Sequence, residues 1–447
     1  MLALRRPATL IVALGLSAIA ASQCSRPRTK PTPPEASAAL RAALKAKTPA
    51  FAGADGERGH HLWREEQRFY KQNGYQLVWT SGRNPRAHMH GLIRGLRAAP
   101  ADGLDPADYH LDELEALRGT PLRHDDPHQA IDLDLRSTYA YLHYAWDLTR
   151  GAIDPEDVDP HWHAAPQGID LGNALDTALG ENLVEASLRD LAPKAPQYQG
   201  LKHQLALSRQ QGDAAAVQQI AMNMERWRWL PDDLGSRYVM VNIPAFRLDI
   251  VEGGKSVLAM NVVAGKKDSP TPVLSDRMKS VVFSPYWNIP SDIAQKEIVP
   301  KVEKDPRYLE RNNIEVDDEG GRYRQRPGKG NSLGLVKFIF PNHFNVYLHD
   351  TPAHALFDRV ERDFSHGCVR LERPMDLARY VLRDQPEWTE EKIRAAMNAG
   401  VEKTVNLREP LPIYLAYFTA WEENGALKTV PDTYGRDRRH DAATGSR

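Results

Sequence analysis

The chain has 447 residues, of which 41% are hydrophobic and 26% are charged, and its formal net charge is −1. This composition is typical of a globular protein and excludes the fibrous and intrinsically disordered classes. A nearly neutral balance gives no general attraction to nucleic acid or to anionic membranes. At this length, two or three domains are expected.

The amino terminus has the pattern of a secretory signal peptide. Arg5 and Arg6 precede an apolar run from Leu10 to Ala21, which small residues follow. The run is shorter than the roughly 20 apolar residues of a membrane-spanning helix. Basic, apolar and small residues in this order predict an export signal over residues 1–22. We therefore expect a periplasmic protein without a transmembrane helix in the mature chain.

Cys24 makes lipid attachment an alternative to free export. A lipoprotein signal has a small residue directly before the cysteine, whereas Gln23 stands there in this chain. Residues 23–36 are rich in proline and are expected to form an extended linker. The second cysteine, Cys368, then has no intramolecular disulfide partner, which indicates a reactive thiol.

The remaining sequence divides into a helical and a β-rich part. Residues 37–215 carry apolar residues at helical spacing, and we interpret the aromatic residues near Tyr139 as helix packing. From about Trp227 onward, apolar residues alternate as in strands. We therefore expect an α+β protein. Its helical domain covers 37–215, its β-rich domain covers 216–436, and a flexible tail covers 437–447.

A polar, glycine-containing insertion over residues 291–331 separates two of the predicted strands. It is long for a connection inside a compact domain. Such insertions are often lids or substrate loops, so we expect this one to border the functional site.

The segment SHGCVR places Cys368 between His366 and Arg370. A neighbouring neutral imidazole is the usual means of activating a thiol nucleophile. His366 would face the same side as the sulfur in an extended segment. His349, at the end of a predicted strand, could reach the sulfur after a helix and a return. The spacing leaves the choice between these two bases open.

Other groups near Cys368 suit an acyl-transfer site. Arg370 could hold a substrate carboxylate or steady a thiolate, and Gly367 and Cys368 offer backbone N–H groups for an oxyanion. Three simpler interpretations of these residues remain: Cys368 is an inert buried cysteine, Arg370 forms an ion pair with Glu372, or the segment binds zinc. The candidate zinc ligands lack paired spacing, so we expect no metal; they are His343, His349, His354, His366 and Cys368.

The segment HDTPAHALFDRVERDFSHGCVRL resembles the signature of the YkuD-type L,D-transpeptidases. That signature is a histidine, about fifteen residues, then Ser/Thr-His-Gly-Cys, a hydrophobic residue and Asn or Arg. The segments NMERWRWLP, SPYWNIP, PGKGNSLGLVKFIFPN and YLHDTP are similar to its YcbB-like branch. That branch commonly has a peptidoglycan-binding module before the ERWRW segment. Only residues 208–222 are available for it here, which are too few.

The resemblance implies a β-sandwich-type catalytic domain, with residues 291–331 as a capping segment. It implies that Cys368 is the nucleophile and His349 the general base, with the backbone carbonyl of Asp350 orienting His349. His366 and Gly367 would support the catalytic motif. Substrate-binding roles are implied for Arg370, Ser365, Tyr347, Trp287 and Asn331.

The implied substrate is the tetrapeptide stem of peptidoglycan, and no cofactor is implied. Cys368 would attack the carbonyl between the third residue, a diamino acid, and the fourth, D-Ala. An amine of a second stem would then take the acyl group and form a 3→3 cross-link. Two alternatives stay open: transfer to water, which is L,D-carboxypeptidase activity, and a non-catalytic peptidoglycan-binding scaffold. The resemblance also implies that carbapenems acylate the site.

Overall fold

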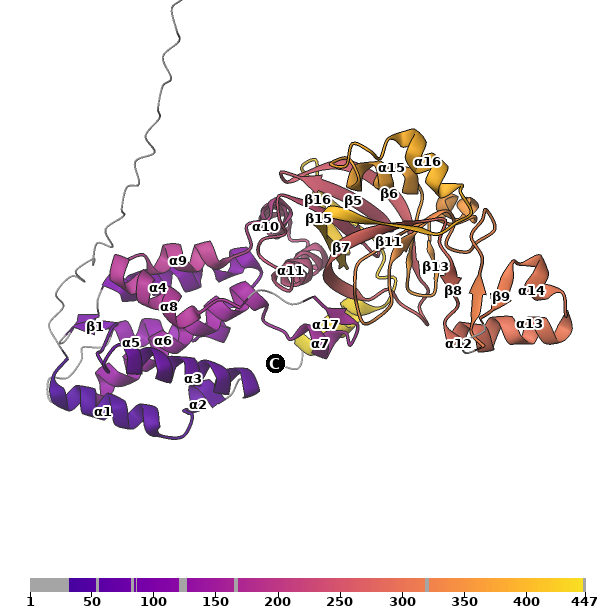
Figure 1. Cartoon of the computed structure of the whole chain (residues 1–447). Coiled ribbons are helices and arrows are strands. Elements are labelled where there is room, and N and C mark those ends of the chain that lie inside the picture. The colour runs from indigo at the N-terminus through magenta and orange to yellow at the C-terminus, as the bar shows by residue number, and fades with distance from the viewer. Residues whose placement is uncertain are drawn as a thin grey trace, which may run out of the picture.

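The computed structural model describes residues 32–53, 56–81, 84–85, 87–119, 127–164, 168–317 and 321–444. The predicted signal peptide, Cys24 and most of the predicted linker lie outside the described residues. Figure 1 shows a helical amino-terminal half joined to a β-rich half, from which a small cap protrudes on the far side. The predicted α+β class is confirmed.

The helical half is organised around the long helix α6. Its neighbours in contact include α1, α3, α4, α5, α8, α9 and α11. Tyr139, Tyr141 and Tyr144 on α6 are buried, so the interpretation of these aromatic residues as helix packing is confirmed. The elements are α1 (Pro34–Lys45), α2 (Ala50–Gly53), α3 (Gly56–Gln72), β1 (Thr80–Ser81), β2 (Asn84–Pro85), α4 (Ala87–Arg97), η1 (Ala99–Asp102), η2 (Pro106–Tyr109), α5 (Leu111–Gly119), α6 (Pro127–Arg150), α7 (Pro155–Val158), β3 (Trp162–His163), α8 (Leu171–Glu181), α9 (Val184–Leu191), α10 (Pro196–Gln211) and α11 (Ala214–Arg228).

The β-rich half is built on one sheet that closes on itself. Its strands follow the order β11-β12-β14-β6-β5-β4-β15-β7-β3, and β11 also pairs with β7. The elements are β4 (Arg237–Asn242), β5 (Arg247–Glu252), β6 (Lys255–Gly265), β7 (Val273–Phe283), β11 (Val336–Ile339), β12 (Leu348–His349), η4 (His354–Asp358), β13 (Asp363–Ser365), β14 (Val369–Leu371), α15 (Pro374–Val381), α16 (Glu390–Met397), β15 (Lys403–Ala416), β16 (Ala420–Glu423), β17 (Ala426–Thr429) and α17 (Arg436–Thr444).

A long, irregular strand lets the sheet turn back on itself. β15 pairs with β7 along both of its ends, and its register shifts between Asn406 and Leu411. Extra residues of this kind, here including Pro410, bend a strand and increase its twist. The closed sheet therefore surrounds a core.

The cap is a small folded unit with its own apolar cluster of Ile289, Ala294, Ile298 and Ile314. Its strands follow the order β8-β10-β9. It begins at Trp287, earlier than the predicted start at residue 291. Its elements are β8 (Trp287–Asn288), α12 (Ser291–Ile293), the π-helical turn η3 (Ala294–Ile298), α13 (Val299–Lys304), α14 (Tyr308–Arg311), β9 (Ile314–Val316) and β10 (Tyr323–Gln325).

Three predicted boundaries differ from the structure. Pro34 to Ala36, assigned to the linker, open α1, because proline suits the first turn of a helix. The predicted boundary between 215 and 216 falls inside α11, which contacts both α10 and β16. The strand β3, from the helical segment, pairs with β7 of the main sheet.

Most of the predicted flexible tail, residues 437–447, is helical in the structure. Residues 436–444 form α17, whose Arg436 is buried and ion-paired with Asp159, while Asp437 pairs with Arg226 at 2.7 Å. These ion pairs join α17 to segments more than 200 residues earlier, so the sequence near residue 437 carries no sign of them. Among the described residues, no helix has the length and apolar character that a membrane span requires.

Glu66 on α3 is a fully buried carboxyl group in the helical half. Neither of its oxygens has a hydrogen-bond partner within the described residues. Burial raises the pKa of Glu66 well above 4.5, and the nearby Asp134 carboxylate adds to this. The protonated form is therefore favoured in the folded state.

We expect Glu66→Met to raise the free energy of unfolding at pH 7 by about 1–3 kcal/mol. A carboxyl group whose pKa is raised by folding contributes its full share to the stability of the folded state below pH 4.5. This stability is lost as the pH rises toward the folded pKa. The gain should therefore shrink at pH 4. Urea unfolding at both pH values measures it, with the exposed Glu57→Met on the same helix as a control. A variant less stable than wild type at pH 7 would contradict this expectation.

Candidate active site

Three neighbouring strands present one side chain each on a common face of the sheet. β12 lies between β11 and β14, with Lys337 opposite His349 and His349 opposite Arg370. The preceding row, Phe338, Leu348 and Val369, is fully buried in the core. Because side chains alternate along a strand, Lys337, His349 and Arg370 project from the other face.

Tyr347 and Cys368 lie one step along the same face. The N–H of Val369 donates to the carbonyl of Tyr347 at 3.1 Å, which aligns the two segments. The Tyr347 hydroxyl forms a hydrogen bond with the Cys368 thiol. The ring centroids of Tyr347 and His349 are 5.7 Å apart. The structure therefore brings Cys368, Tyr347, His349 and Arg370 together on one patch of the sheet. Along the chain, the first pair, Tyr347 and His349, is separated from Cys368 and Arg370 by about twenty residues.

His349 is buried and held in one tautomer. Its Nδ1 lies 2.6 Å from the backbone carbonyl of Asp350, and a carbonyl can only accept, so Nδ1 carries the proton. Burial lowers the pKa of His349 to about 3, with a further contribution from the Arg370 charge. The imidazole is therefore neutral near pH 7. The backbone of Leu333 also lies within hydrogen-bonding reach of the ring.

Cys368 is half-buried and in its thiol form near neutral pH. Burial raises the pKa of the Cys368 thiol to about 11, although hydrogen bonds from Tyr347 and the Arg370 charge act in the opposite direction. Its Sγ also lies 3.7 Å from the carbonyl of Asn345. The resting pair is therefore a neutral thiol and a neutral imidazole, not a thiolate–imidazolium pair.

Asp350 fixes the strand that carries His349. Its carboxylate accepts hydrogen bonds from the backbone N–H of Leu335 at 2.8 Å and of Thr351 at 2.7 Å. Gly334, with φ +61°, packs so closely on this carboxylate that a Cβ there would lie 2.4 Å from it. Only glycine fits this position without moving Asp350.

The turn before Cys368 is held by hydrogen bonds within the motif. The Ser365 hydroxyl donates to the carbonyl of Cys368 and accepts from the N–H of Gly367 at 3.1 Å. Gly367 has φ +109°, a conformation that other residues adopt only with strain. Ser365 therefore supports the turn, and its hydroxyl is not left for a substrate as expected. The Gly367 N–H is also occupied, whereas the Cys368 N–H makes no hydrogen bond within the described residues.

Thr271 is a supporting residue that the sequence did not indicate. Its buried hydroxyl donates to the carbonyl of Gly367 and accepts from the N–H of Gly265, both at 2.9 Å. It lies almost 100 residues before the motif. Thr271 therefore ties the turn to the end of β6.

We expect Thr271→Val to lower the free energy of unfolding by about 1–3 kcal/mol, because two buried backbone groups lose their partner. Thr271→Ser keeps the hydroxyl and is the matched control. Urea unfolding of the two variants measures the difference. Equal stability of Thr271→Val and wild type would show that the hydroxyl does not hold the turn.

His366 does not face the sulfur in the way that an extended segment would require. Its Nε2 lies 2.8 Å from the Glu297 carboxylate of the cap and 3.4 Å from the Lys266 ammonium. The positive φ of Gly367 breaks the alternation on which that expectation depended. His366 therefore joins the catalytic turn to the cap.

Asn331 and Trp287, both expected to contact substrate, belong to the cap and to its junction with the sheet, and their substrate roles stay predictions. The Asn331 amide donates to the carbonyls of Pro285, Gln325 and Arg326 at 3.0–3.2 Å, and its oxygen accepts from Leu333. Its polar atoms are thus used in joining the cap to the sheet. Trp287 is partly buried against the apolar cluster of the cap.

Arg370 is a cation without a carboxylate partner among the described residues. Its Nε is buried and makes no hydrogen bond there. Glu372 instead accepts hydrogen bonds from the backbone and side chain of Asn261 at 3.0 and 3.1 Å, so the expected alternative of an Arg370–Glu372 pair is wrong. A poorly paired, partly buried cation is suited to binding an anionic ligand.

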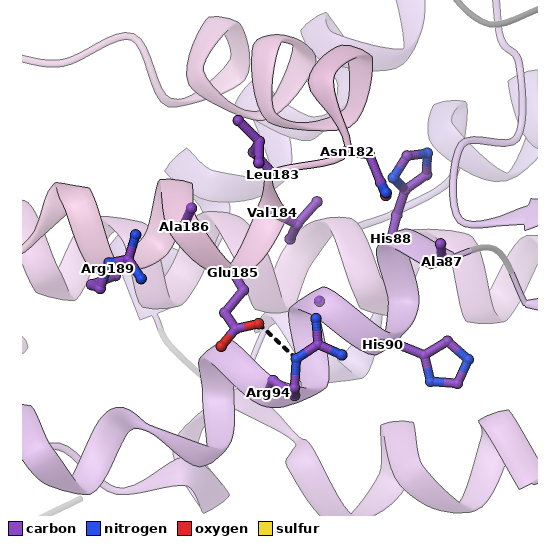
Figure 2. A pocket seen from close by; sticks show the side chains of 11 residues that line it. Ala87, His88, His90, Arg94, Asn182, Leu183, Val184, Glu185, Ala186 and Arg189 are labelled. Atoms are coloured by element: carbon purple, nitrogen blue, oxygen red, sulfur yellow. Dashed lines mark hydrogen bonds and ion pairs between the residues drawn. The ribbon is translucent and has the colours of Figure 1, made fainter.

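In the part of the chain that the structure describes, neither a metal-ligand cluster nor a pocket in the helical half coincides with this patch of Cys368, Tyr347, His349 and Arg370. Within the described residues, no three His, Cys, Asp or Glu residues are grouped so as to hold a metal ion. A pocket of about 620 Å³ lies in the helical half between α4 and α9, where Arg94 pairs with Glu185 at 2.6 Å (Figure 2). Its lining includes His88, His90 and Arg189 but no nucleophile.

Each half of the chain matches a known protein family. Residues 64–205 match the Scaffold domain family, and residues 236–394 match the L,D-transpeptidase catalytic domain family, YkuD. Residues 236–394 are thus similar to YkuD-type L,D-transpeptidase catalytic domains. The resemblance indicated by the SHGCVR segment is confirmed.

A relative from Haemophilus influenzae, named "Putative L,D-transpeptidase", is 29% identical over 405 residues, which are 83% of this chain and 78% of that protein. Solved structures also match. An L,D-transpeptidase from Mycobacterium smegmatis matches with 16% identity and a TM-score of 0.23, over 40% of this chain and 58% of that chain. L,D-transpeptidase 3 from Mycobacterium tuberculosis, in complex with a faropenem-derived adduct, matches with 17% identity and a TM-score of 0.22, over 40% and 60%. The present chain therefore matches less than two thirds of the length of each of these two solved structures.

Proposed function

We propose that this chain is an exported L,D-transpeptidase that forms 3→3 cross-links between peptidoglycan stems through an acyl-enzyme on Cys368. The observation that carries the proposal is the shared face of Cys368, His349 and Arg370 in a YkuD-type domain. A nucleophile, a neutral oriented base and an available cation are the parts that acyl transfer from an anionic peptide needs.

In the first half-reaction, His349 Nε2 accepts the thiol proton while Sγ attacks the carbonyl between the diamino acid and D-Ala. The tetrahedral intermediate carries its negative charge on the former carbonyl oxygen, near the Cys368 N–H. When it collapses, the C–N bond breaks and the proton on His349 passes to the amine of the leaving D-Ala. A thioester between Cys368 and the tripeptide stem remains.

In the second half-reaction, the side-chain amine of another stem attacks the thioester. His349 accepts a proton from this amine, and the thiolate that leaves as the amide forms takes a proton back. The free energy of the broken peptide bond is kept in the thioester, so the exchange needs no nucleotide. This suits a reaction outside the cytoplasm, which the predicted signal over residues 1–22 would require.

The order of pKa values favours concerted proton transfer. With the pKa of Cys368 near 11 and that of His349 near 3, a free thiolate is rare before the substrate binds. Attack therefore has to be coupled to removal of the proton by His349. Arg370 would bind a substrate carboxylate and hold the scissile carbonyl near Sγ.

Incubation of the purified chain with disaccharide-tetrapeptides, followed by mass spectrometry of the products, tests the proposal. Cross-linked dimers that have lost one D-Ala are expected. Tripeptide monomers alone would instead establish the L,D-carboxypeptidase reaction at the same site. Unchanged substrate would favour the non-catalytic scaffold and contradict both enzymatic functions.

A further inference from the structure

We propose that Lys337 is a second carboxylate-binding residue, so that the donor stem carries a free carboxylate on the side chain of its third residue. This inference rests on the proposed function and extends it. A diamino acid with a side-chain carboxylate would be accepted in preference to lysine, which has none.

Lys337 and Arg370 flank His349 across the sheet. Lys337 lies opposite His349 on β11, and Arg370 lies opposite His349 on β14. Since neighbouring strands are about 4.8 Å apart, the backbones of the two cations are about 10 Å apart. The Lys337 ammonium lies 6.0 Å from the centre of the Tyr347 ring, whose hydroxyl reaches Cys368. Both cations therefore border the position of the reacting carbonyl.

The ammonium of Lys337 is mostly buried but incompletely paired. The side chain is 17% exposed, and Nζ lies 3.9 Å from a Glu402 oxygen and 3.4 Å from the Tyr286 carbonyl. That same Glu402 oxygen already accepts the Tyr286 N–H at 2.7 Å. Burial lowers the pKa of Lys337, which shows that the charged form lacks full compensation.

The two carboxylates of such a stem match these two cations. The carboxylate of the leaving D-Ala is separated from the scissile carbonyl only by one nitrogen and one carbon, so it suits Arg370, near the thiol. A carboxylate at the end of the third residue's side chain is several bonds further away. It suits Lys337, on the opposite side of His349.

The alternative role for Lys337 is a structural pair with Glu402, and it predicts different results. Three tetrapeptide donors separate the two roles: one with the side-chain carboxylate free, one with it amidated, and one with lysine as the third residue. The readout is the rate of Cys368 acylation by each donor, measured by intact-protein mass.

For the wild-type chain we expect a preference of about 10- to 100-fold for the free carboxylate over the amidated donor, as for a charge-assisted hydrogen bond. Lys337→Met should reduce this ratio to about 1, and Lys337→Arg should retain part of it. Glu402→Gln should keep the wild-type ratio.

A wild-type chain that acylates with all three donors at similar rates would overturn the inference and leave the proposed function standing. So would a Lys337→Met variant that slows every donor by the same factor, or a Glu402→Gln variant that loses the preference. No acylation of the wild-type chain by any donor would instead overturn the proposed function, and this inference with it.

Discussion

Replacing Cys368 with serine is expected to reduce acyl-enzyme formation from a tetrapeptide donor by at least about 1,000-fold. A hydroxyl is far harder to deprotonate than a thiol. The base is weak as well, because burial lowers the pKa of His349 to about 3. A base of this strength can assist a thiol that attacks as it loses its proton, but it cannot generate a serine alkoxide.

Cys24→Ser is the matched control, since Cys24 is the other cysteine of the chain. Its acylation rate should equal that of the wild type. A carbapenem offers a second readout, because it would form a covalent adduct at the same thiol. Labelling that persists in Cys368→Ser would mean that another group is the nucleophile.

Replacing His349 with glutamine is expected to lower the acylation rate by about 100- to 10,000-fold, the usual contribution of a general base. Glutamine keeps a similar length but cannot accept the thiol proton. His366→Gln should have a much smaller effect, because His366 Nε2 contacts the Glu297 carboxylate and the Lys266 ammonium. If His366→Gln were the more damaging change, the assignment of the base would be wrong.

The pH dependence gives an independent check on His349. A general base acts in its neutral form, which is populated above its pKa, and burial lowers the pKa of His349 from 6.5 to about 3. The wild-type acylation rate should therefore stay level from pH 8 down to about pH 5. A decline centred near pH 6.5 would show that the active imidazole is solvated and contradict the buried site.

The sequence predicted the elements well where the signal was local. Alternation around residues 237–265 predicted strands, and the apolar spacing on α6 predicted a packed helix. The functional motif was also local, because Ser365 to Arg370 are consecutive. Each of these inferences needed only neighbours along the chain.

Predictions that depended on long-range pairing were incomplete. Spacing alone left His349 and His366 as alternative bases, and the register between β12 and β14 now supports His349. The hydrogen bond from Thr271 to the Gly367 carbonyl and the ion pair from Glu297 to His366 join residues about 70 to 100 positions apart. No periodicity or composition signal links such positions.

The assumption of an extended segment caused the clearest local error. Gly367 was expected to offer its N–H to an oxyanion, and Ser365 its hydroxyl to a substrate. The left-handed turn at Gly367 brings these two groups together instead, so each satisfies the other. A sequence with a glycine at this position permits such a turn but does not specify it.

In the proposed reaction, Cys368 carries the donor stem as a thioester. Intact-protein mass spectrometry of the chain, quenched in acid shortly after mixing with a disaccharide-tetrapeptide, tests it most directly. We predict a mass increase equal to the disaccharide-tripeptide acyl group, mapped by proteolysis to the peptide that contains Cys368, together with release of D-Ala. Release of D-Ala with no adduct on Cys368, or an adduct mapped to another residue, would contradict it.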